Sequence, residues 1–362
     1  RRAVVDRHIY RLSLVQCAAD AGTASSVMSR IAVVTGGAGF IGSHAVDSLL
    51  SRGFQVRIID DLSGGRLKNV EHVIDLDEVD FFEMDVCALE RQSPIFEGTD
   101  LVLHFAGVGD IVPSVECPHD YMRINVLGTV RVLEAARYSK VRRFVYAASS
   151  SCYGANPPTP TDELAPIVAE YPYALSKYQG EQAVFHWSNV YGLSANAIRI
   201  FNAYGTRSRT SGAYGAVMGV FLKQKLEGAP FTVVGDGSQL RDFVYVTDVA
   251  EAFVLAGLSS HTGRVWNLGS GAPQSINHLV EVLGGDVVYL PRRPGEPDVT
   301  WADSTAIRND LGWSPKVSFE EGVEQILENI AYWKDAPLWD EKSIAQATES
   351  WFHTLGAGGD VS

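Results

Sequence analysis

The stretch Ile31-Ala32-Val33-Val34-Thr35-Gly36-Gly37-Ala38-Gly39-Phe40-Ile41-Gly42 decides the fold of this chain. Its first residues, 31–34, predict a buried parallel strand, and residues 40–52 predict the helix that follows. The glycines at 36, 39 and 42 suit a tight turn, a close approach of a pyrophosphate, and close helix–sheet packing. A pyrophosphate there would lie on the exposed N–H groups of the first helical turn, beside Phe40 and Ile41. The sequence therefore predicts a dinucleotide-binding unit.

The identity of the dinucleotide is predicted from a second strand, residues 55–59, which ends at Asp60 and Asp61 and is followed by Ser63. A carboxylate at this position accepts hydrogen bonds from the adenosine ribose diol and repels a 2′-phosphate, so NAD is favoured over NADP. The alternative is that both aspartates merely end the strand in a solvated turn with Ser63. The glycine stretch lies at the spacing that a dinucleotide site requires, which favours the cofactor role.

Composition excludes several classes of function. The chain has 362 residues, 46% hydrophobic and 20% charged, which is enough for a large core and one or two domains. A net charge of −13 does not favour binding to nucleic acid or to an anionic membrane. No apolar stretch approaches the roughly 18 residues that span a bilayer. The four cysteines and nine histidines show no metal-ligand spacing, so we expect reduced thiols, no metal and a cytoplasmic location.

Three regions follow from the pattern of elements. Residues 1–27 precede the first strand, and we expect a weakly ordered extension rather than a signal peptide. Residues 28–205 alternate apolar strands with amphipathic helices, which predicts an α/β fold with a doubly wound parallel (Rossmann) sheet that binds NAD. Residues 206–355 have shorter elements and predict a smaller C-terminal α+β substrate lobe, from which some segments return to the Rossmann domain.

The predicted elements bring polar residues to one edge of the sheet. Strands are predicted over 31–35, 55–60, 79–84, 100–105, 143–148 and 196–200. Helices after residue 205 are predicted over 214–227, 247–257, 275–283, 303–311, 319–333 and 341–355. Ligands bind such sheets at the carboxyl ends of the strands. The residues that follow these strands are Asp85, Gly107, Gly109, Ser149–Ser151 and Asn202.

The catalytic prediction rests on Tyr173 and Lys177, which are four residues apart and so lie on one face of a helix that Pro172 helps to start. A tyrosine with a pKa near 10 is a poor base at neutral pH. A neighbouring ammonium and a nicotinamide cation both favour its phenolate. Ser149 could share the proton of a substrate hydroxyl. The alternative is that Tyr173 is only a core aromatic at a helix start.

Taken together, these motifs resemble the extended short-chain dehydrogenase/reductase family, in the branch of nucleotide-sugar epimerases of UDP-glucose and UDP-N-acetylglucosamine 4-epimerase type. The resemblance covers about residues 30–335. The motifs that carry it are Gly36–Gly42, Asp60–Ser63, Asp85-Val86, His104–Gly107, Ala148–Gly154, the Tyr173/Lys177 pair, Arg199–Asn202, Gly235–Asp248, Arg293–Glu296 and Trp301–Asp303.

The resemblance implies a transient oxidation at C4 of a UDP-hexose, with tyrosine taking the hydroxyl proton and tightly bound NAD taking the hydride. The catalytic positions are Tyr173, Lys177 and Ser149. The implied cofactor-binding positions are Gly36, Gly39, Phe40, Ile41, Gly42, Asp60, Asp61, Ser63, Asp85, Val86, Phe105, Ala106, Gly107, Asn125, Tyr173 and Lys177. The implied substrate-binding positions are Gly109, Ser149, Ser150, Asn202, Ala216, Val217, Arg241, Arg293, Glu296 and Thr300. These positions could instead have purely structural roles: Arg241 could pair with Asp242 at the surface, and Asn202 could cap a turn.

Departures from related enzymes narrow the expected reaction. Sugar 4,6-dehydratases of this family have an Asp-Glu pair after the catalytic Ser/Thr, and decarboxylases usually have a glutamate there, whereas this chain has Ser150 and Ser151. Cys152 lies near the position of a catalytic cysteine in some relatives, but it is one residue nearer to the following Tyr-Gly pair than that cysteine is. We therefore expect Cys152 to be a packed thiol without a chemical role. A reductase that uses external NADPH is disfavoured by Asp60, and a non-enzymatic NAD sensor would not need the catalytic set.

The substrate prediction rests on small residues where relatives restricted to unacetylated hexoses have a lysine and a tyrosine. These positions are Gly109 and Thr300, and Ala216 matches a small wall residue of acetamido-preferring enzymes. Small walls favour UDP-GlcNAc and UDP-GalNAc, or their uronic acids, in addition to UDP-glucose and UDP-galactose. Thr300 could instead be an exposed strand residue. By analogy, a homodimer is expected through helices at about 118–138 and 173–190.

Overall fold

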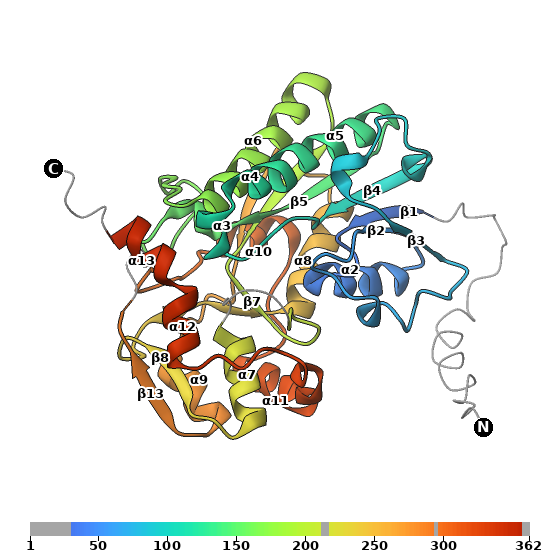
Figure 1. The fold of residues 1–362 in the computed structure, drawn as a ribbon. Helices are drawn as coiled ribbons and strands as arrows, with labels where there is room; N and C mark the ends of the chain where they lie inside the picture. Colours follow the sequence, from blue (N-terminus) through green and yellow to red (C-terminus); the bar gives the residue numbers. More distant parts are fainter. Residues whose placement is uncertain (1–29, 211–216, 293–295, 357–362) are drawn as a thin grey trace, which may run out of the picture.

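The computed structural model describes residues 30–210, 217–292 and 296–356, and a parallel sheet of seven strands forms its centre (Figure 1). The strand order is β11-β6-β5-β4-β1-β2-β3. The order reverses between β1 and β4, which is where a doubly wound sheet opens its ligand crevice. The strands are β1 (Ile31–Thr35), β2 (Gln55–Asp60), β3 (Val79–Glu83), β4 (Thr99–His104), β5 (Arg143–Ser149), β6 (Ala195–Ile200) and β11 (Val265–Leu268). The predicted fold class is confirmed.

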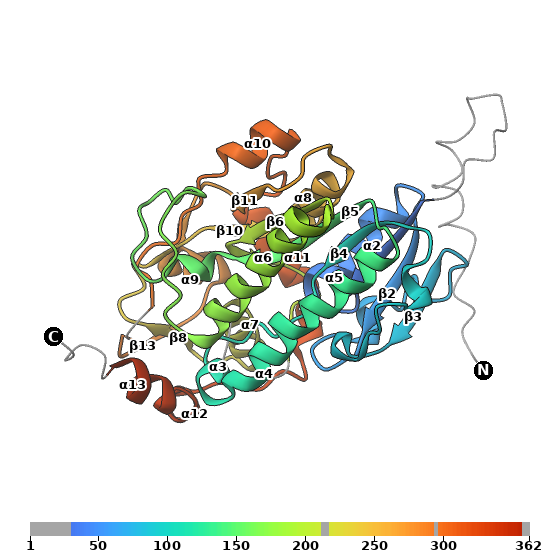
Figure 2. The same ribbon diagram turned by 90° about the horizontal axis from the view of Figure 1, so that it is seen from above.

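Both faces of the sheet are covered because successive strand residues point to opposite sides. In β1, Val34 packs with the helices α2 (Phe40–Leu50) and α8 (Val246–Leu258). Its neighbour Val33 packs on the other side with α5 (Thr129–Tyr138) and α6 (Pro172–Tyr191). Figure 2 shows α5 and α6 side by side across one face of the sheet. The near-continuous apolar strands predicted from the sequence are therefore buried on both faces.

The six predicted strands agree with the structure to within one residue at each end, but the seventh was not predicted. β11 pairs in parallel with β6, from Val265 opposite Ala197 to Leu268 opposite Ile200. This strand, α8 and the helix over 305–311 are segments after residue 205 that return to the sheet. The boundaries of the three predicted regions remain predictions. β11 was missed because four residues between loops give too little periodicity to distinguish a strand from a turn.

The C-terminal lobe has its own hydrophobic core under the ligand edge of the sheet. Phe221, Phe231, Leu279, Val323 and Trp333 are almost fully buried in it. Its main elements are α7 (Val217–Glu227), β8 (Phe231–Val234), α9 (Ile276–Leu283), β13 (Val287–Leu290) and α11 (Phe319–Glu328). β13 pairs in parallel with β8. The predicted helix over 319–333 is shorter than expected, because α11 ends at Glu328 and a short 3₁₀ turn follows.

The remaining elements are short, and several border the site. They are α3 (Pro113–Glu116), α4 (Pro118–Tyr121), a π-helical turn (Met122–Gly128), β7 (Asn202–Tyr204), β9 (Leu240–Arg241), β10 (Phe243–Tyr245), β12 (Gln274–Ser275), α10 (Thr305–Leu311), α12 (Glu341–Ala347) and α13 (Glu349–Gly356). The helix predicted over 341–355 is thus divided into α12 and α13. In the part of the chain that the structure describes, no helix is long and apolar enough to cross a membrane.

Candidate active site

A cleft of about 680 Å³ lies between the carboxyl ends of the sheet strands and the C-terminal lobe. It collects most of the residues that the sequence analysis named for the cofactor and the substrate. Those that line it are Gly36, Gly39, Phe40, Ile41, Gly42, Asp60, Asp61, Ser63, Asp85, Val86, Phe105, Ala106, Gly107, Gly109, Ser149, Ser150, Tyr173, Lys177, Asn202, Val217, Arg241, Glu296 and Thr300. Asn125 does not line it, and Ala216 and Arg293 lie outside the described residues.

The glycine turn at the start of α2 fits a dinucleotide pyrophosphate. Gly36 has a φ of +69°, and a Cβ there would lie 2.7 Å from the Ala106 backbone nitrogen. A Cβ on Gly42 would overlap the Gly36 carbonyl oxygen. Helix α2 has no capping side chain at Gly39 and no acidic residue in its first turn, so no side chain of its own caps its first N–H groups. Gly39–Gly42 line the cleft, where these N–H groups can bind an anion. This cradle has the shape and polarity that NAD needs.

The two aspartates after β2 have different surroundings. Asp60 is 6% exposed, and its two oxygens accept hydrogen bonds from the backbone nitrogens of Ala38 and Leu62, each at 2.9 Å. Burial raises the pKa of Asp60. Asp61 is exposed and accepts from the Ser63 backbone nitrogen at 2.9 Å and its hydroxyl at 2.6 Å. Asp60 therefore fastens the glycine turn, while Asp61 forms the surface turn.

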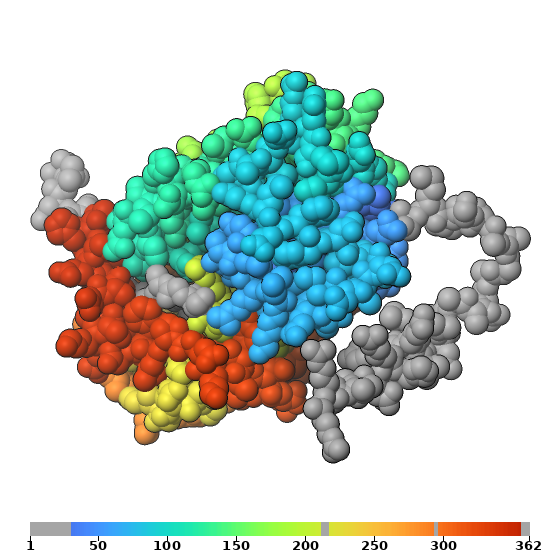
Figure 3. Space-filling model, turned by 45° about the vertical axis from the view of Figure 1, so that its right-hand side comes forward, coloured from blue at the N-terminus to red at the C-terminus, as the bar shows by residue number. Residues whose placement is uncertain are grey.

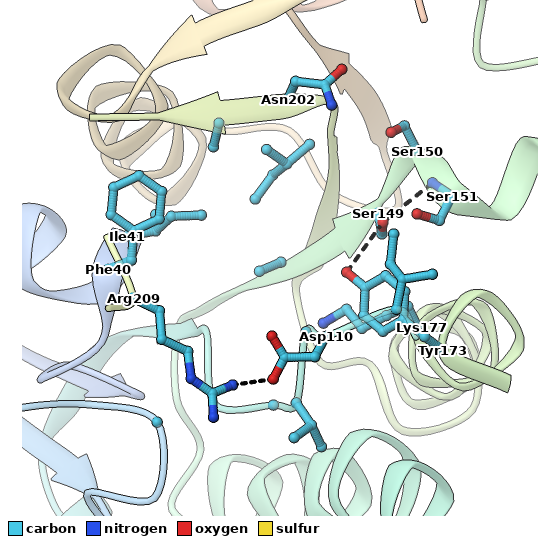
Figure 4. A pocket seen from close by; sticks show the side chains of 18 of the residues that line it. Phe40, Ile41, Asp110, Ser149, Ser150, Ser151, Tyr173, Lys177, Asn202 and Arg209 are labelled. Carbon is cyan, nitrogen blue, oxygen red and sulfur yellow. Dashed lines mark hydrogen bonds and ion pairs between the residues drawn. The ribbon is translucent and has the colours of Figure 1, made fainter. Parts of the chain in front are cut away.

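Tyr173, Ser149 and Lys177 meet at the carboxyl end of β5 (Figure 4). The Tyr173 hydroxyl donates to Ser149 Oγ at 3.4 Å. Ser149 also accepts from the Ser151 backbone nitrogen at 3.2 Å, which fixes its orientation. Lys177 lies one helical turn after Tyr173 and is 7% exposed. The predicted catalytic set is thus brought together in the cleft.

In the chain itself, burial is the main influence on the pKa values of this set. Burial raises the pKa of Tyr173, and the Asp110 carboxylate raises it further by a smaller amount, whereas the hydrogen bond between Tyr173 and Ser149 lowers it. Burial also lowers the pKa of Lys177 to about 7. The reason is that both groups lie in a low-dielectric pocket of the protein, which disfavours their charged forms. The chain by itself therefore keeps the tyrosine protonated.

Lys177 is held in place by residues under α6. Its ammonium nitrogen lies 4.5 Å from the centre of the Tyr146 ring, and the Tyr146 hydroxyl donates to the Lys177 carbonyl oxygen at 3.2 Å. Gly180 leaves room for that hydroxyl, which a Cβ would overlap. One turn further, Glu181 forms a buried bidentate pair with Arg199 at 2.6 and 2.9 Å. These contacts fix the helix that carries both Tyr173 and Lys177.

Asn125 lies behind the wall of the cleft and holds it in place. Its side-chain oxygen accepts from the Val108 backbone nitrogen at 2.8 Å, and its amide nitrogen donates to Ser176 Oγ at 2.9 Å. It is 1% exposed and belongs to the π-helical turn. The Asn125 side chain therefore positions the loop after β4 against α6.

Asn202, in β7, and Thr300, in a loop of the C-terminal lobe, are joined on one wall of the cleft. Thr300 Oγ1 donates to Asn202 Oδ1 at 2.6 Å and accepts from the Asp242 backbone nitrogen at 3.2 Å. Arg241 is 7% exposed and donates to Glu296 at 3.1 Å. Asp242 instead accepts hydrogen bonds from the segment 270–271 and from the backbone nitrogen of residue 302. Arg241 is therefore directed into the cleft and is not the surface partner of Asp242.

The sequence analysis missed an ion pair that crosses the cleft. Asp110, in the loop after β4, pairs with Arg209, in the loop after β7, and Figure 4 shows Asp110 between Arg209 and the Tyr173–Lys177 pair. Both residues line the cleft. The position of Asp110 just after Gly107 and Gly109 was the available signal. Nothing in the sequence links it to an arginine 99 residues away.

The cysteines and the potential metal ligands are the other reactive groups of the chain. Cys152 is 1% exposed, and burial raises its pKa to about 12, so it stays a neutral thiol at physiological pH. Cys87, Cys117 and Cys152 are not disulfide-bonded, and Cys17 lies outside the described residues. Among the residues that the structure describes, no three His, Cys, Asp or Glu side chains are placed to hold a metal ion.

Comparison with known proteins identifies the family. The chain belongs to the NAD dependent epimerase/dehydratase family, which it matches over residues 32–269. The UDP-glucose 4-epimerase of Mycolicibacterium smegmatis is 36% identical over 304 residues, which cover 82% of this chain and 97% of that protein. NAD, the cofactor predicted from Asp60, is therefore the cofactor of the family to which the chain belongs.

Two solved structures share the fold over nearly their whole length. A UDP-N-acetylglucosamine 4-epimerase from Methanobrevibacter ruminantium, in complex with UDP-N-acetylmuramic acid, is 31% identical with a TM-score of 0.78. A UDP-glucuronic acid 4-epimerase from Bacillus cereus, in complex with UDP-glucuronic acid and NAD, is 28% identical with a TM-score of 0.78. Each match covers 83% of this chain and 99% of the other. These relatives support an enzyme of the UDP-sugar 4-epimerase kind.

Proposed function

We propose that this protein is a UDP-hexose 4-epimerase with tightly bound NAD that accepts N-acetylated sugars as well as UDP-glucose and UDP-galactose. The observation that carries the proposal is the Tyr173 hydroxyl 3.4 Å from Ser149 Oγ, beside Lys177, in the same cleft as the glycine cradle. The set serves proton transfer to and from a sugar hydroxyl. The relatives named above act on this class of substrate.

In the proposed reaction, Ser149 and Tyr173 both bind the sugar 4-hydroxyl, and Tyr173 takes its proton as C4 is oxidised. When bound, NAD supplies the hydride acceptor and a positive charge that opposes the effect of burial on Tyr173. Lys177 would add a second positive charge and would hold the nicotinamide ribose. After the 4-keto sugar turns over in the cleft, the same tyrosine returns the proton.

The cleft also offers groups for the rest of the cofactor and the nucleotide. We propose that Asp60 binds the adenosine ribose, and that Asp85 and Val86 contact the adenine. Arg241, which is buried with its charge directed into the cleft, would bind the sugar diphosphate together with Asn202. Glu296 would accept from the nucleoside ribose. Arg293 and Ala216 keep their predicted roles, although they lie outside the described residues.

Acceptance of an acetamido group is supported by free space beside small residues. A Cβ built on Gly109 meets no atom within 4 Å, although Gly109 lines the cleft. Thr300, on the opposite wall, is short and bonded to Asn202. Two relatives with solved structures bind UDP-N-acetylmuramic acid and UDP-glucuronic acid, which supports such substrates. We therefore propose UDP-GlcNAc, UDP-GalNAc or their uronic acids as additional substrates.

A 4,6-dehydratase or a decarboxylase is the second candidate, because the family includes dehydratases. Elimination of water needs an acid and a base next to Ser149. The residues there are Ser150 and Ser151, and both are hydroxyls that titrate far from neutral pH. We therefore rank this reaction below epimerisation. A non-enzymatic NAD sensor ranks lower still, since it needs no tyrosine–lysine pair.

The assembly and the cellular setting remain proposals. Exposed apolar side chains lie on and beside the helices α5 and α6, where the homodimer was predicted: Leu127, Tyr138, Leu175, Val190 and Tyr191. Large apolar groups on adjacent helices suit an interface between two copies of a chain. We propose a cytoplasmic homodimer that supplies sugars for polysaccharide biosynthesis. Sedimentation of the purified protein would measure its oligomeric state.

The function is tested by offering the purified protein a panel of UDP-, GDP-, CDP- and dTDP-hexoses without added cofactor and identifying the products by NMR. We expect the 4-epimer of a UDP-hexose and no net release of NADH. Accumulation of a 4-keto product or release of CO₂ would instead establish the lyase. NADH released in proportion to product would refute an epimerase.

A further inference from the structure

The C-terminal segment joins the two sides of the cleft. Its first helix, α12, belongs to the lobe, because Ile344 is 4% exposed in the lobe core. The next helix, α13, leaves the lobe and lies beside α3 of the Rossmann domain (Figures 1 and 2). Figure 3 shows this C-terminal segment, in red, against the teal segment that contains α3 and α4. A hydrogen bond from Ser350 Oγ to Glu116 at 2.6 Å fastens α13 there.

One side chain of α13, Trp351, reaches the cleft. It lines the cleft and is 5% exposed, and its ring centre lies 5.4 Å from that of Tyr171. Tyr171 precedes Pro172, the first residue of α6, and so is two residues from the catalytic Tyr173. Tyr171 and Ser151 also line the cleft. Trp351 therefore stands behind the part of the wall that faces the reacting end of the sugar.

The surroundings of Trp351 separate it from the nucleotide-binding side. Arg241 was proposed above to bind the diphosphate and Glu296 to bind the nucleoside. Arg241 belongs to β9, and Glu296 to the loop before Thr300. The aromatic contact of Trp351 is with Tyr171, at the start of α6, whereas the glycine cradle and Asp60 belong to the start of α2 and the end of β2. Large, rigid aromatic rings provide much contact area in ligand pockets, and they pack well on the C–H face of a sugar ring.

We propose that α13 closes the sugar end of the cleft and that Trp351 determines affinity for the sugar without affecting affinity for UDP. This inference rests on the proposed function, since it takes a UDP-sugar as the ligand. Tyr171 is the intermediate contact: with Trp351 behind it, the aromatic pair forms a rigid wall beside the catalytic helix. Removing the indole leaves that wall unsupported and enlarges the sugar end of the cleft.

The test compares Kd values for UDP and for a UDP-sugar, measured by calorimetry on the purified full-length protein. For Trp351→Ala we expect Kd for UDP-glucose and UDP-GlcNAc to rise about tenfold, which is roughly 1.4 kcal/mol, with Kd for UDP within about twofold of the wild type. Phe352→Ala is the matched control, because Phe352 is the next residue of the same helix and is 38% exposed. It should change neither value.

A second variant keeps the indole but weakens the attachment of α13 to the Rossmann domain. Ser350→Ala removes the hydrogen bond to Glu116, and we expect it to weaken UDP-sugar binding in the same direction as Trp351→Ala but by less. Unchanged Kd values for both ligands in Trp351→Ala, or an equal loss for UDP and for UDP-sugar, would overturn the proposal, because a purely structural helix gives one of these results.

The outcome is independent of whether the reaction is an epimerisation. The Kd ratio is a binding measurement and needs no turnover, whereas the reaction is identified from the NMR products of the wild type. A wild-type protein that binds UDP-sugars but forms no 4-epimer would refute the proposed function. The ratio of the two Kd values would still measure the contribution of Trp351 to affinity for the sugar. Thermal unfolding of each variant checks that the lobe core around Ile344 stays folded.

Discussion

Replacing Thr300 by tyrosine should suppress turnover of N-acetylated sugars far more than turnover of UDP-glucose. Thr300 lines the cleft, and its hydroxyl donates to Asn202 Oδ1 at 2.6 Å and accepts from the Asp242 nitrogen at 3.2 Å. A tyrosine places a rigid ring where we expect the acetamido group. Forcing extra atoms into a packed site costs on the order of 1–3 kcal/mol. Borne only by the acetylated sugar, this is roughly a 5- to 150-fold change in kcat/KM.

The substitution also removes both hydrogen bonds of the threonine hydroxyl, and that loss affects every substrate. The assay is therefore a ratio, kcat/KM for UDP-GlcNAc divided by kcat/KM for UDP-glucose, in the wild type and the variant. Thr300→Val is the control, because it loses the same hydroxyl but keeps the volume. It should lower both rates and leave the ratio unchanged. An unchanged ratio in Thr300→Tyr would refute the steric reasoning and remove the main support for an acetamido substrate.

Three further predictions concern the catalytic helix and its surroundings. Tyr173→Phe should lower kcat by roughly 10²–10⁴-fold without loss of fold or NAD content, whereas Tyr178→Phe on the same helix should not; a loss below about threefold would place the proton elsewhere. Asp110→Asn removes a carboxylate that raises the pKa of Tyr173, so the part of the kcat–pH profile that requires ionised Tyr173 should move to lower pH. Asp120→Asn, at an exposed position of α4, is the control and should leave the profile in place. A shift to higher pH in Asp110→Asn would contradict this. Lys177→Met should make the protein more stable to urea at pH 7, since the pKa of Lys177 is lowered to about 7 in the folded chain and folding must then remove a proton that the unfolded chain keeps. The wild type should gain stability as the pH rises from 7 toward 10 and the variant should lack this gain, so parallel stability curves would argue against a buried, destabilised lysine.

Much of the fold and part of the site could be predicted from the sequence because the signals are local. The strands up to residue 200 have five to seven residues and are mostly apolar, and the glycine turn and the Tyr173/Lys177 spacing fix their own geometry within a few residues. β11 was missed because a four-residue run has no measurable period.

The unpredicted parts of the site depend on contacts between distant segments. The pair of Asp110 and Arg209 joins loops 99 residues apart, and the contact of Trp351 with Tyr171 depends on how the C-terminal helix folds back. The raised pKa of Tyr173 follows from burial, which no spacing reveals. Asn125 was predicted to bind the cofactor, but its side chain holds the loop after β4 from behind the cleft wall.

The most direct test of the central claim is to run the reaction in D₂O with UDP-glucose and UDP-GlcNAc and examine C4 of the product by NMR. An epimerase that moves the hydride to NAD and back retains the original hydrogen at C4, so we predict the 4-epimer with protium at C4 and no net change in absorbance at the wavelength of NADH. A product with deuterium at C4, or a 4-keto-6-deoxy sugar in place of the epimer, would contradict the account.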